Sequence, residues 1–296
     1  YRFFDNSRVE PALMLAPHIE QTAERIRDGG EPTVLFLQDT VYLDYGRRPA
    51  TRGLDKVARA GSGTATEGLM LHNTLVSTVS GLPLGLADQR FIDRKHFLGP
   101  DKNASGTRRV DQPVEQRESC RWIDVVRDCA ALDTGAARRV HVCDREADFY
   151  ELFRDAAALG EHVLVRASRN RSIDKRKRRD APSVWLFDAL DAEPERCRTT
   201  ISIQVNGKKK YRTAELSIAY RSVSMPPPPN RSVARHGANL PMVNLNAIIA
   251  VERNAPDGQE PLCWVLLTSL EVTDAAAAIE KVRWYSTRWN VEICQP

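Results

Sequence analysis

The apolar positions near the start of this 296-residue chain change from helical spacing to a continuous run. Residues 17–26 carry the helical spacing, and Gly29 and Gly30 are a typical helix stop, so we predict a helix there. Residues 32–38 (PTVLFLQ) are almost entirely apolar, which is typical of a strand buried on both faces. The chain therefore opens with a helix that leads into a central strand.

Polar residues interrupt this apolar run at Asp39 and Thr40, and we expect the buried strand to end there. The next residues, 41–46 (VYLDYG), then predict a second strand. Further along, residues 69–78 and 82–92 predict two strands of a hairpin that turns at Ser80-Gly81.

The middle of the chain alternates between helical and strand patterns. Residues 115–132 have apolar side chains at helical spacing, and residues 140–143 form a short buried strand pattern. A helix over 148–159 and a strand over 162–166 follow. Strands that alternate with helices predict an α/β fold, with a mixed sheet flanked by helices.

The pattern changes again between residues 168 and 261, where alternating segments predict antiparallel strands. Two of them, 199–205 (TTISIQV) and 214–220 (AELSIAY), flank a turn signal at Asn206-Gly207. Prolines at 226–229 cannot continue a strand ladder or a helix. We therefore expect a β-rich insertion that divides the α/β part into two segments, so that the chain reads 1–167, 168–261 and 262–296.

The last segment opens with an apolar strand pattern from Leu262 and continues into a helix. Either Thr273 or Asp274 is expected to cap that helix, since both residue types accept hydrogen bonds from the first turn.

Composition narrows the class of protein. Hydrophobic residues make up 42% of the chain and charged residues 28%, without a run of 18 apolar residues, so we expect a globular protein with no membrane span. The start of the chain does not have the pattern of a signal peptide. The six cysteines form no C-x-x-C pair, which argues against zinc and favours a reduced, cytoplasmic protein.

Positive charge is unevenly distributed. Eight Lys or Arg residues fall between Arg166 and Arg179, opposed only by Asp174, and Lys208–Lys210 form a second run. Such runs are either solvated loops or arms that contact phosphates, because neutralising phosphates releases counterions from nucleic acid.

Two aspartates follow the apolar strands. Asp39 follows the first buried strand and Asp144 follows the strand over 140–143. Ligands bind beyond the carboxyl ends of strands in open α/β sheets, so these carboxylates could meet around a cation. Taken singly, each could also be a turn or helix-capping residue.

A third carboxylate lies near the end of the chain, in RWYSTRWNVEICQP. Tyr285, Arg288 and Glu292 are spaced by three and four residues, which predicts that they share one face of a helix. An ordinary Arg288–Glu292 ion pair would explain the two charges, but not the tyrosine on the same face.

These motifs together resemble the YREK-type DDE transposases of bacterial insertion sequences (insertion sequence family four, cut-and-paste type). The resemblance rests on D-R-E-A-D after a strand and on Y-x2-R-x3-E in a late helix. It extends over the whole chain through YRFFDN, LFLQDT, GLMLHNTL with GLPLGL, and WVLLTSLEV. The resemblance implies an RNase H-like fold interrupted by a β-rich insertion.

The resemblance also implies roles for single residues. Asp39, Asp144 and Glu292 match the catalytic, metal-binding triad. Tyr285 and Arg288 match positions that bind a phosphate near the transposon end. Trp264 matches a tryptophan that stacks on a flipped base, although a core aromatic is the alternative. The basic residues expected to contact DNA are Arg145, Arg166 and Arg169, and the remaining D-R-E-A-D charges, Glu146 and Asp148, would orient Asp144 or contact DNA.

The implied chemistry is metal-dependent nicking and strand transfer. Three carboxylates suit Mg²⁺ or Mn²⁺, and two such ions can serve an in-line displacement at phosphorus. The implied partners are double-stranded DNA, both transposon ends and target, and a second copy in a homodimer of the full-length protein. The expected location is the bacterial cytoplasm, associated with the nucleoid.

The family signature continues to a Lys that would stand at position 299, beyond Pro296. A truncated DNA-binding remnant without catalysis therefore stays open as an alternative function. A stand-alone RNase H-like nuclease is a further alternative.

Overall fold

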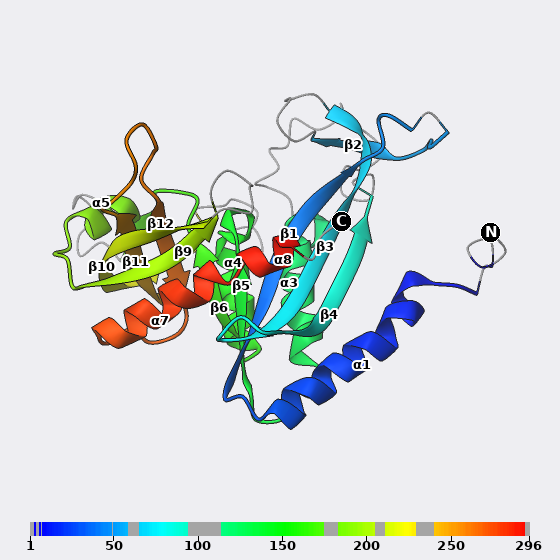
Figure 1. The fold of residues 1–296 in the computed structure, drawn as a ribbon, viewed down its shortest axis with the longest axis horizontal. Helices are drawn as coiled ribbons and strands as arrows, with labels where there is room; N and C mark the ends of the chain where they lie inside the picture. The colour runs from blue at the N-terminus through cyan, green and yellow to red at the C-terminus, as the bar shows by residue number, and fades with distance from the viewer. Residues whose placement is uncertain are drawn as a thin grey trace. The chain divides into compact units, whose positions relative to one another are not determined.

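The computed structural model describes residues 3, 6, 8–48, 50–58, 65–93, 114–174, 183–204, 211–228 and 240–293. The chain forms two compact units (Figure 1). Unit 1 comprises Tyr1–Arg139 and Asn290–Pro296, and unit 2 comprises Val140–Trp289.

Unit 1 begins with the long helix α1, Pro11–Gly29. Proline suits its first position, where the backbone N–H has no helical partner to lose. The helix stops where the sequence predicts, because Gly30 adopts a left-handed conformation (φ 62°) and donates to the carbonyl of Arg27. Its start lies upstream of the predicted residue 17, and Pro17 lies inside the helix.

The strands of unit 1 are antiparallel: β1 (Thr33–Asp44), β2 (Asp55–Ala58), β3 (Ala65–Thr78) and β4 (Pro83–Ile92). Strand β3 lies between β1 and β2 and also pairs with β4. The β3–β4 pair confirms the predicted hairpin, in which Gly81 supplies the positive φ (90°) that the turn requires.

The predicted end of the first strand at Asp39-Thr40 is wrong. Strand β1 pairs with β3 without interruption from Val34 to Asp44, so residues 41–46 contain no separate strand. At Asp39 the side chains change from buried to half-buried. The polar residues therefore mark the point where β1 leaves the core, while its backbone hydrogen bonds continue.

Helix α3 (Cys120–Ala130) supplies the core of unit 1, after a short 3-10 turn η2 (Val114–Gln116). It confirms the helix predicted over 115–132 in its central part. Its Val125 and Cys129 pack in one apolar cluster with Val34 and Phe36 of β1 and Ile26 of α1. Residues 290–293 of the last helix, α8 (Trp289–Ile293), also belong to this unit.

Unit 2 begins within β5 (Arg138–Cys143) and contains the predicted strand–helix–strand segment, which continues with η3 (Arg145–Ala147), α4 (Tyr150–Ala158) and β6 (His162–Arg166). Strands β5 and β6 are parallel neighbours, as expected of strands joined by a helical crossover. The predicted helix start at Asp148 is two residues early, because Asp148 ends η3 and α4 begins at Tyr150.

Beyond β6 the sheet of unit 2 continues with antiparallel neighbours in the order β6-β12-β11-β10-β9. These strands are β9 (Cys197–Gln204), β10 (Tyr211–Met225), β11 (Val243–Glu252) and β12 (Cys263–Thr268). Strands β9 and β10 pair as the two alternating segments predict, although the turn signal between them lies outside the described residues. Strand β10 ends where the prolines begin.

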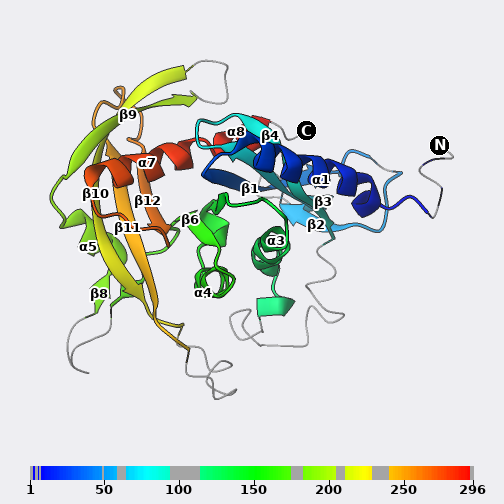
Figure 2. The same ribbon diagram turned by 90° about the horizontal axis from the view of Figure 1, so that it is seen from below.

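The remaining elements of unit 2 are a small sheet of β7 (Ser172–Ile173) and β8 (Val184–Trp185), helix α5 (Leu186–Asp191) and helix α7 (Ala275–Ser286). Helix α7 packs on β9 and β10 (Figure 2). Of the two possible caps for this helix, Asp274 is the residue used, and its carboxylate accepts the N–H of Ala277 at 2.8 Å.

The described residues thus form a mixed α/β fold, with parallel and antiparallel strand neighbours and helices on the sheets. Residues 168–261 are rich in strands, as predicted. The three segments 1–167, 168–261 and 262–296 stay a prediction. None of the described helices has the length and apolar character needed to cross a membrane.

Candidate active site and nucleic-acid interface

Asp144 lies directly after β5, at the carboxyl end of that strand. Its side chain is half-buried and caps η3, because Oδ1 accepts the N–H of Glu146 at 2.8 Å. This hydrogen bond fixes the direction of the carboxylate. The backbone of Glu146 therefore orients Asp144, whereas the side chains of Arg145 and Glu146 are exposed.

Tyr285 lies near both Asp144 and Arg288 within unit 2. Arg288 is 8% exposed and Tyr285 is 3% exposed. Burial raises the pKa of Tyr285, and Asp144 raises it further, while Arg288 and Arg166 lower it. Asp144 and Arg288 also act on the buried thiol of Cys143. Burial raises the pKa of this thiol, Asp144 adds to the rise and Arg288 opposes it. A tyrosine, a carboxylate and two guanidinium groups therefore share one environment.

Trp264 is buried inside unit 2, where its ring contacts the ring of Tyr285. It is 2% exposed, and the two ring centroids are 4.9 Å apart at an interplanar angle of 73°. An edge-to-face pair of this kind stabilises a core. The burial of Trp264 favours its role as a core aromatic. The base-stacking role stays a prediction.

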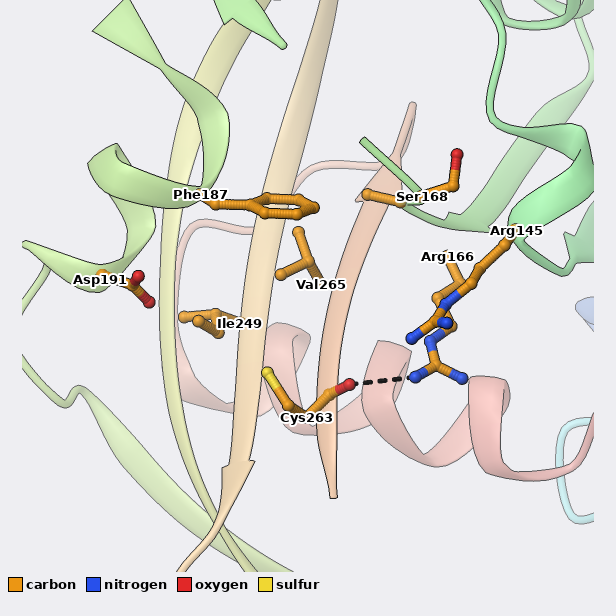
Figure 3. Close-up of a pocket in the computed structure, with 9 residues that line it drawn as sticks. Arg145, Arg166, Ser168, Phe187, Asp191, Ile249, Cys263 and Val265 are labelled. Carbon is orange, nitrogen blue, oxygen red and sulfur yellow. Dashed lines mark hydrogen bonds between the residues drawn. The ribbon is translucent and has the colours of Figure 1, made fainter. Parts of the chain in front are cut away.

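A pocket of about 320 Å³ opens on the face of β12 opposite to Trp264 (Figure 3). Val265 lines it, because successive residues of a strand point to opposite faces. Phe187 and Ile249 add to its apolar wall, and Asp191 lies at its far end from the arginines. The full lining comprises Arg145, Arg166, Ala167, Ser168, Phe187, Asp191, Ile249, Cys263 and Val265.

The guanidinium groups of Arg145 and Arg166 lie next to each other at this pocket (Figure 3). Arg166 donates to the carbonyl of Cys263 at 3.1 Å and has no carboxylate partner among the described residues. Burial lowers the pKa of Arg166, and the neighbouring charge of Arg145 lowers it further. Two adjacent cations with no counter-ion between them in the described part of the chain form a candidate anion site.

Sequence reasoning identified the two arginines but missed the rest of the pocket. Phe187 and Asp191 belong to a short helix in the β-rich segment, and Cys263 opens β12. No motif signals these residues. Arg169, also predicted to contact DNA, is exposed and does not line the pocket.

The other two members of the predicted triad belong to unit 1. Asp39 is half-buried in the middle of β1, opposite Asn73 of β3, which accepts a hydrogen bond from Gln89 at 3.0 Å. Glu292 is exposed on α8. Asp144, by contrast, belongs to unit 2.

The next residue of β1, Thr40, begins a hydrogen-bonded network. Its hydroxyl lies 2.8 Å from Nδ1 of buried His72 and 3.2 Å from Nε of Arg121. Gln38 lies 3.3 Å from the other ring nitrogen of His72. Burial lowers the pKa of His72, and the charges of Arg121 and Arg90 lower it further.

The predicted single helix carrying Tyr285, Arg288 and Glu292 is wrong. Helix α7 ends at Ser286 and α8 starts at Trp289. The hydroxyls of Ser286 and Thr287 donate to carbonyls three residues earlier, both at 2.7 Å. Such local bonds compete with the helical ladder, so the three side chains do not share one continuous helix.

Among the described residues, no group of three or more His, Cys, Asp or Glu side chains is placed to bind a metal ion. The basic residues 175–179 and 208–210 lie outside the described residues. No family model matches the chain.

Proposed function

We propose that the chain is the RNase H-like catalytic core of a DDE-type DNA transposase, which nicks and joins DNA strands at transposon ends. The D-R-E-A-D and Y-x2-R-x3-E motifs support this proposal, as does the strand-rich segment between Asp144 and Glu292. The particular family proposed is that of the YREK-type insertion sequence transposases. Its partners would be double-stranded DNA and, in the full-length protein, a second copy, in the nucleoid of a bacterial cell.

The observation that carries the proposal is the set of charges around Asp144 in unit 2. Arg288 and Arg166 both act on Tyr285, close to a carboxylate that is fixed at the end of β5. Arginine binds phosphate through charge-assisted hydrogen bonds from a planar fork. A carboxylate beside such cations is suited to chemistry at a phosphodiester, because the cations would place the phosphate next to a carboxylate that is held at the end of β5.

Tyr285 is expected to bind phosphate as a neutral donor. Burial raises the pKa of its hydroxyl above the ordinary value of 10, so the proton stays on the oxygen at neutral pH. A phenolate would repel the phosphate. The buried position thus keeps Tyr285 in the form that can donate a hydrogen bond.

The donor chemistry of Asp39, Asp144 and Glu292 fits Mg²⁺ or Mn²⁺, since all three are hard oxygen ligands. When bound, such ions activate the attacking oxygen and stabilise the leaving oxygen. Within unit 2, the backbone N–H of Glu146 would orient the carboxylate of Asp144 for such an ion.

A DNA-binding protein without catalysis is the second candidate. It is favoured by one observation, namely that Arg145 and Arg166 form their cationic pocket within unit 2, independently of Asp39 and Glu292. Such a protein would bind DNA with an affinity that falls steeply with salt, but it would not cleave.

Nicking of a supercoiled plasmid tests the proposal. The plasmid carries the DNA that flanks the gene on both sides, and the same plasmid without these flanks is the substrate control. We expect nicking with Mg²⁺ or Mn²⁺ that is lost in Asp144→Asn and Glu292→Ala. Asp257→Asn and Glu260→Ala, at exposed positions, are the matched control variants and should nick at the wild-type rate.

The outcomes separate the candidates. Loss of nicking in both active-site variants, with DNA binding retained, supports the transposase core. Equal nicking of the plasmid without flanks favours a stand-alone nuclease. DNA binding without nicking in any form of the protein favours the non-catalytic protein. Absence of both DNA binding and nicking would contradict the proposal.

A further inference from the structure

A buried carboxylate connects the chain that leaves β6 to the turn that carries Asp144. The side chain of Asp148 is fully buried, at the end of η3. Its Oδ2 accepts both the N–H of Ser168 at 2.6 Å and the hydroxyl of Ser168 at 3.1 Å. Two segments that are 20 residues apart are thereby joined at one carboxylate.

Arg171 completes this arrangement. Its guanidinium forms an ion pair with Oδ1 of Asp148 and also donates to the backbone carbonyl of Asp148 at 3.1 Å. Burial lowers the pKa of Arg171, and Asp148 opposes that effect. We call Asp148, Ser168 and Arg171 the Asp148 cluster. Because both charges are removed from water, loss of either partner leaves the other uncompensated.

The Asp148 cluster is close in sequence to both arginines of the pocket. Arg145 is three residues before Asp148 on the same 3-10 turn, and Arg166 is two residues before Ser168. Ser168 itself lines the pocket. The bonds from Asp148 to Ser168 therefore limit how far the two guanidinium groups can move apart.

Such a restraint is needed because the two groups repel each other. The charge of Arg145 acts against that of Arg166, and Arg166 is partly desolvated and has no carboxylate partner within the described residues. Without a restraint, the two arginine side chains would separate and lose the convergence seen in Figure 3.

We propose that Asp148 is a positioning residue, which keeps Arg145 and Arg166 together as a binding site for a DNA phosphate. The proposal rests on the proposed function in taking DNA as the anion. It assigns Asp148 neither to the metal nor to direct contact with DNA, since its side chain is buried and its two oxygens bind Ser168 and Arg171.

The direction in which one substitution changes the affinity for DNA tests this role. Asp148→Asn removes a negative charge from a protein that binds a polyanion, so electrostatics alone would raise its DNA affinity. A positioning role requires the opposite. We expect the affinity of Asp148→Asn for a 30-base-pair duplex to fall about tenfold, as when one charged hydrogen-bonded contact is lost. We also expect the slope of log affinity against log salt to shrink by about one.

Glu161→Gln is the matched control. It makes the same change of charge in another buried carboxylate of unit 2, which is paired with His141. Glu161 immediately precedes β6, whereas Arg166 is the last residue of that strand. Its affinity for the duplex should equal or exceed that of the wild type. An Asp148→Asn protein that binds DNA as tightly as Glu161→Gln would overturn the proposal.

Hydrogen exchange measures the same cluster without DNA. The amide of Ser168 should exchange at least about tenfold faster in Asp148→Asn than in the wild type, since its acceptor is weakened. Ser168→Ala, which removes only the hydroxyl, is a milder variant in case Asp148→Asn does not fold. It should show a smaller increase in exchange at residue 168 and a smaller loss of affinity.

The two measurements separate the possible failures. If the wild-type protein does not bind DNA, the proposed function fails, and exchange at Ser168 still reports whether Asp148 restrains this segment. If DNA binds but exchange at Ser168 is unchanged in Asp148→Asn, the positioning role fails by itself.

Discussion

The edge of one ring meets the face of the other where Trp264 of β12 contacts Tyr285 of α7, with centroids 4.9 Å apart. Both side chains are almost completely buried. This contact joins β12, the last strand along the chain, to α7, which packs on β9 and β10 of the same sheet. It also brings the Tyr285 hydroxyl near Arg288 and Arg166. A residue predicted to stack on a base thus packs against the tyrosine that is proposed to bind a phosphate.

The first prediction concerns this supporting role. Trp264→Ala should lower the free energy of unfolding by about 3–5 kcal/mol, because it removes a large buried ring. Urea denaturation followed by circular dichroism measures the change. Trp289→Ala, at a side chain that is 45% exposed, is the control and should change stability by no more than about 0.5 kcal/mol. Unchanged stability with weakened DNA binding in Trp264→Ala would instead indicate a base-stacking role.

The second prediction concerns the hydroxyl of Tyr285 at alkaline pH. Burial raises its pKa in the folded protein above the ordinary value of 10. Between the unfolded and the folded pKa, only the folded state keeps the proton, so this residue's contribution to stability falls as the pH rises above 10. Below pH 10 it is constant.

Unfolding by urea at several pH values between 8 and 11 checks this dependence. The free energy of unfolding should fall less steeply above pH 10 in Tyr285→Phe than in the wild type. Tyr211→Phe, at a side chain that is 59% exposed, provides the comparison. Identical slopes for the wild type and Tyr285→Phe would contradict the raised pKa.

The third prediction concerns His72 at mildly acidic pH. Burial, with the charges of Arg121 and Arg90, lowers the pKa of His72 well below its ordinary value of 6.5. The unfolded chain therefore binds a proton before the folded protein does, and stability falls as the pH drops below 6.5. Above pH 6.5 this contribution is complete.

Thermal unfolding between pH 5 and pH 8 measures the effect. His72→Gln should flatten the loss of stability on the acid side, although it lowers stability at pH 8 by disturbing the bonds to Thr40 and Gln38. His18→Gln, at an exposed position, is the matched control. An unchanged acid slope in His72→Gln would show that other groups govern this pH range.

The fourth prediction concerns Gly85 of β4, which has a φ of 142°. A Cβ atom at this position would lie 2.2 Å from the hydroxyl of Thr22 on α1. Gly85→Ala should therefore destabilise the protein by at least about 1–3 kcal/mol, through backbone strain and displacement of the helix. Gly29→Ala has open space and a helical position, so it should stabilise the protein by about 0.4–1 kcal/mol.

Chemical denaturation of the two variants against the wild type checks both signs. Equal stability of Gly85→Ala and the wild type would show that β4 and α1 can separate without cost.

The sequence by itself determined the elements that local chemistry specifies. The stop of α1 at Gly30 and the hairpin at Gly81 each depend on the conformation of one residue, and the cap of α7 could be narrowed to Thr273 or Asp274. The β5–α4–β6 segment follows from apolar periodicity, which sets which face is buried. The position of Asp144 at a strand end could be predicted for the same reason.

Only the tertiary structure decided features that depend on distant partners. Strand β1 continues through Asp39 because β3 supplies hydrogen bonds to its backbone, whatever the polarity of its side chains. The stop of α7 at Ser286 depends instead on a local competition, because hydroxyl groups at the end of this helix donate to carbonyls three residues earlier. Periodicity carries no signal for either event.

The candidate phosphate site shows the same limit. Arg145, Arg166 and Phe187 are far apart in the sequence, and the order of strands brings them to one pocket. Asp148 reads as one more charge in a charged motif, yet it is buried because Ser168 and Arg171 compensate its carboxylate. Local patterns therefore determined where charge occurs along the chain. Which charges are buried, paired or left to face an anion was decided by packing, because desolvation depends on all neighbours of a group at once.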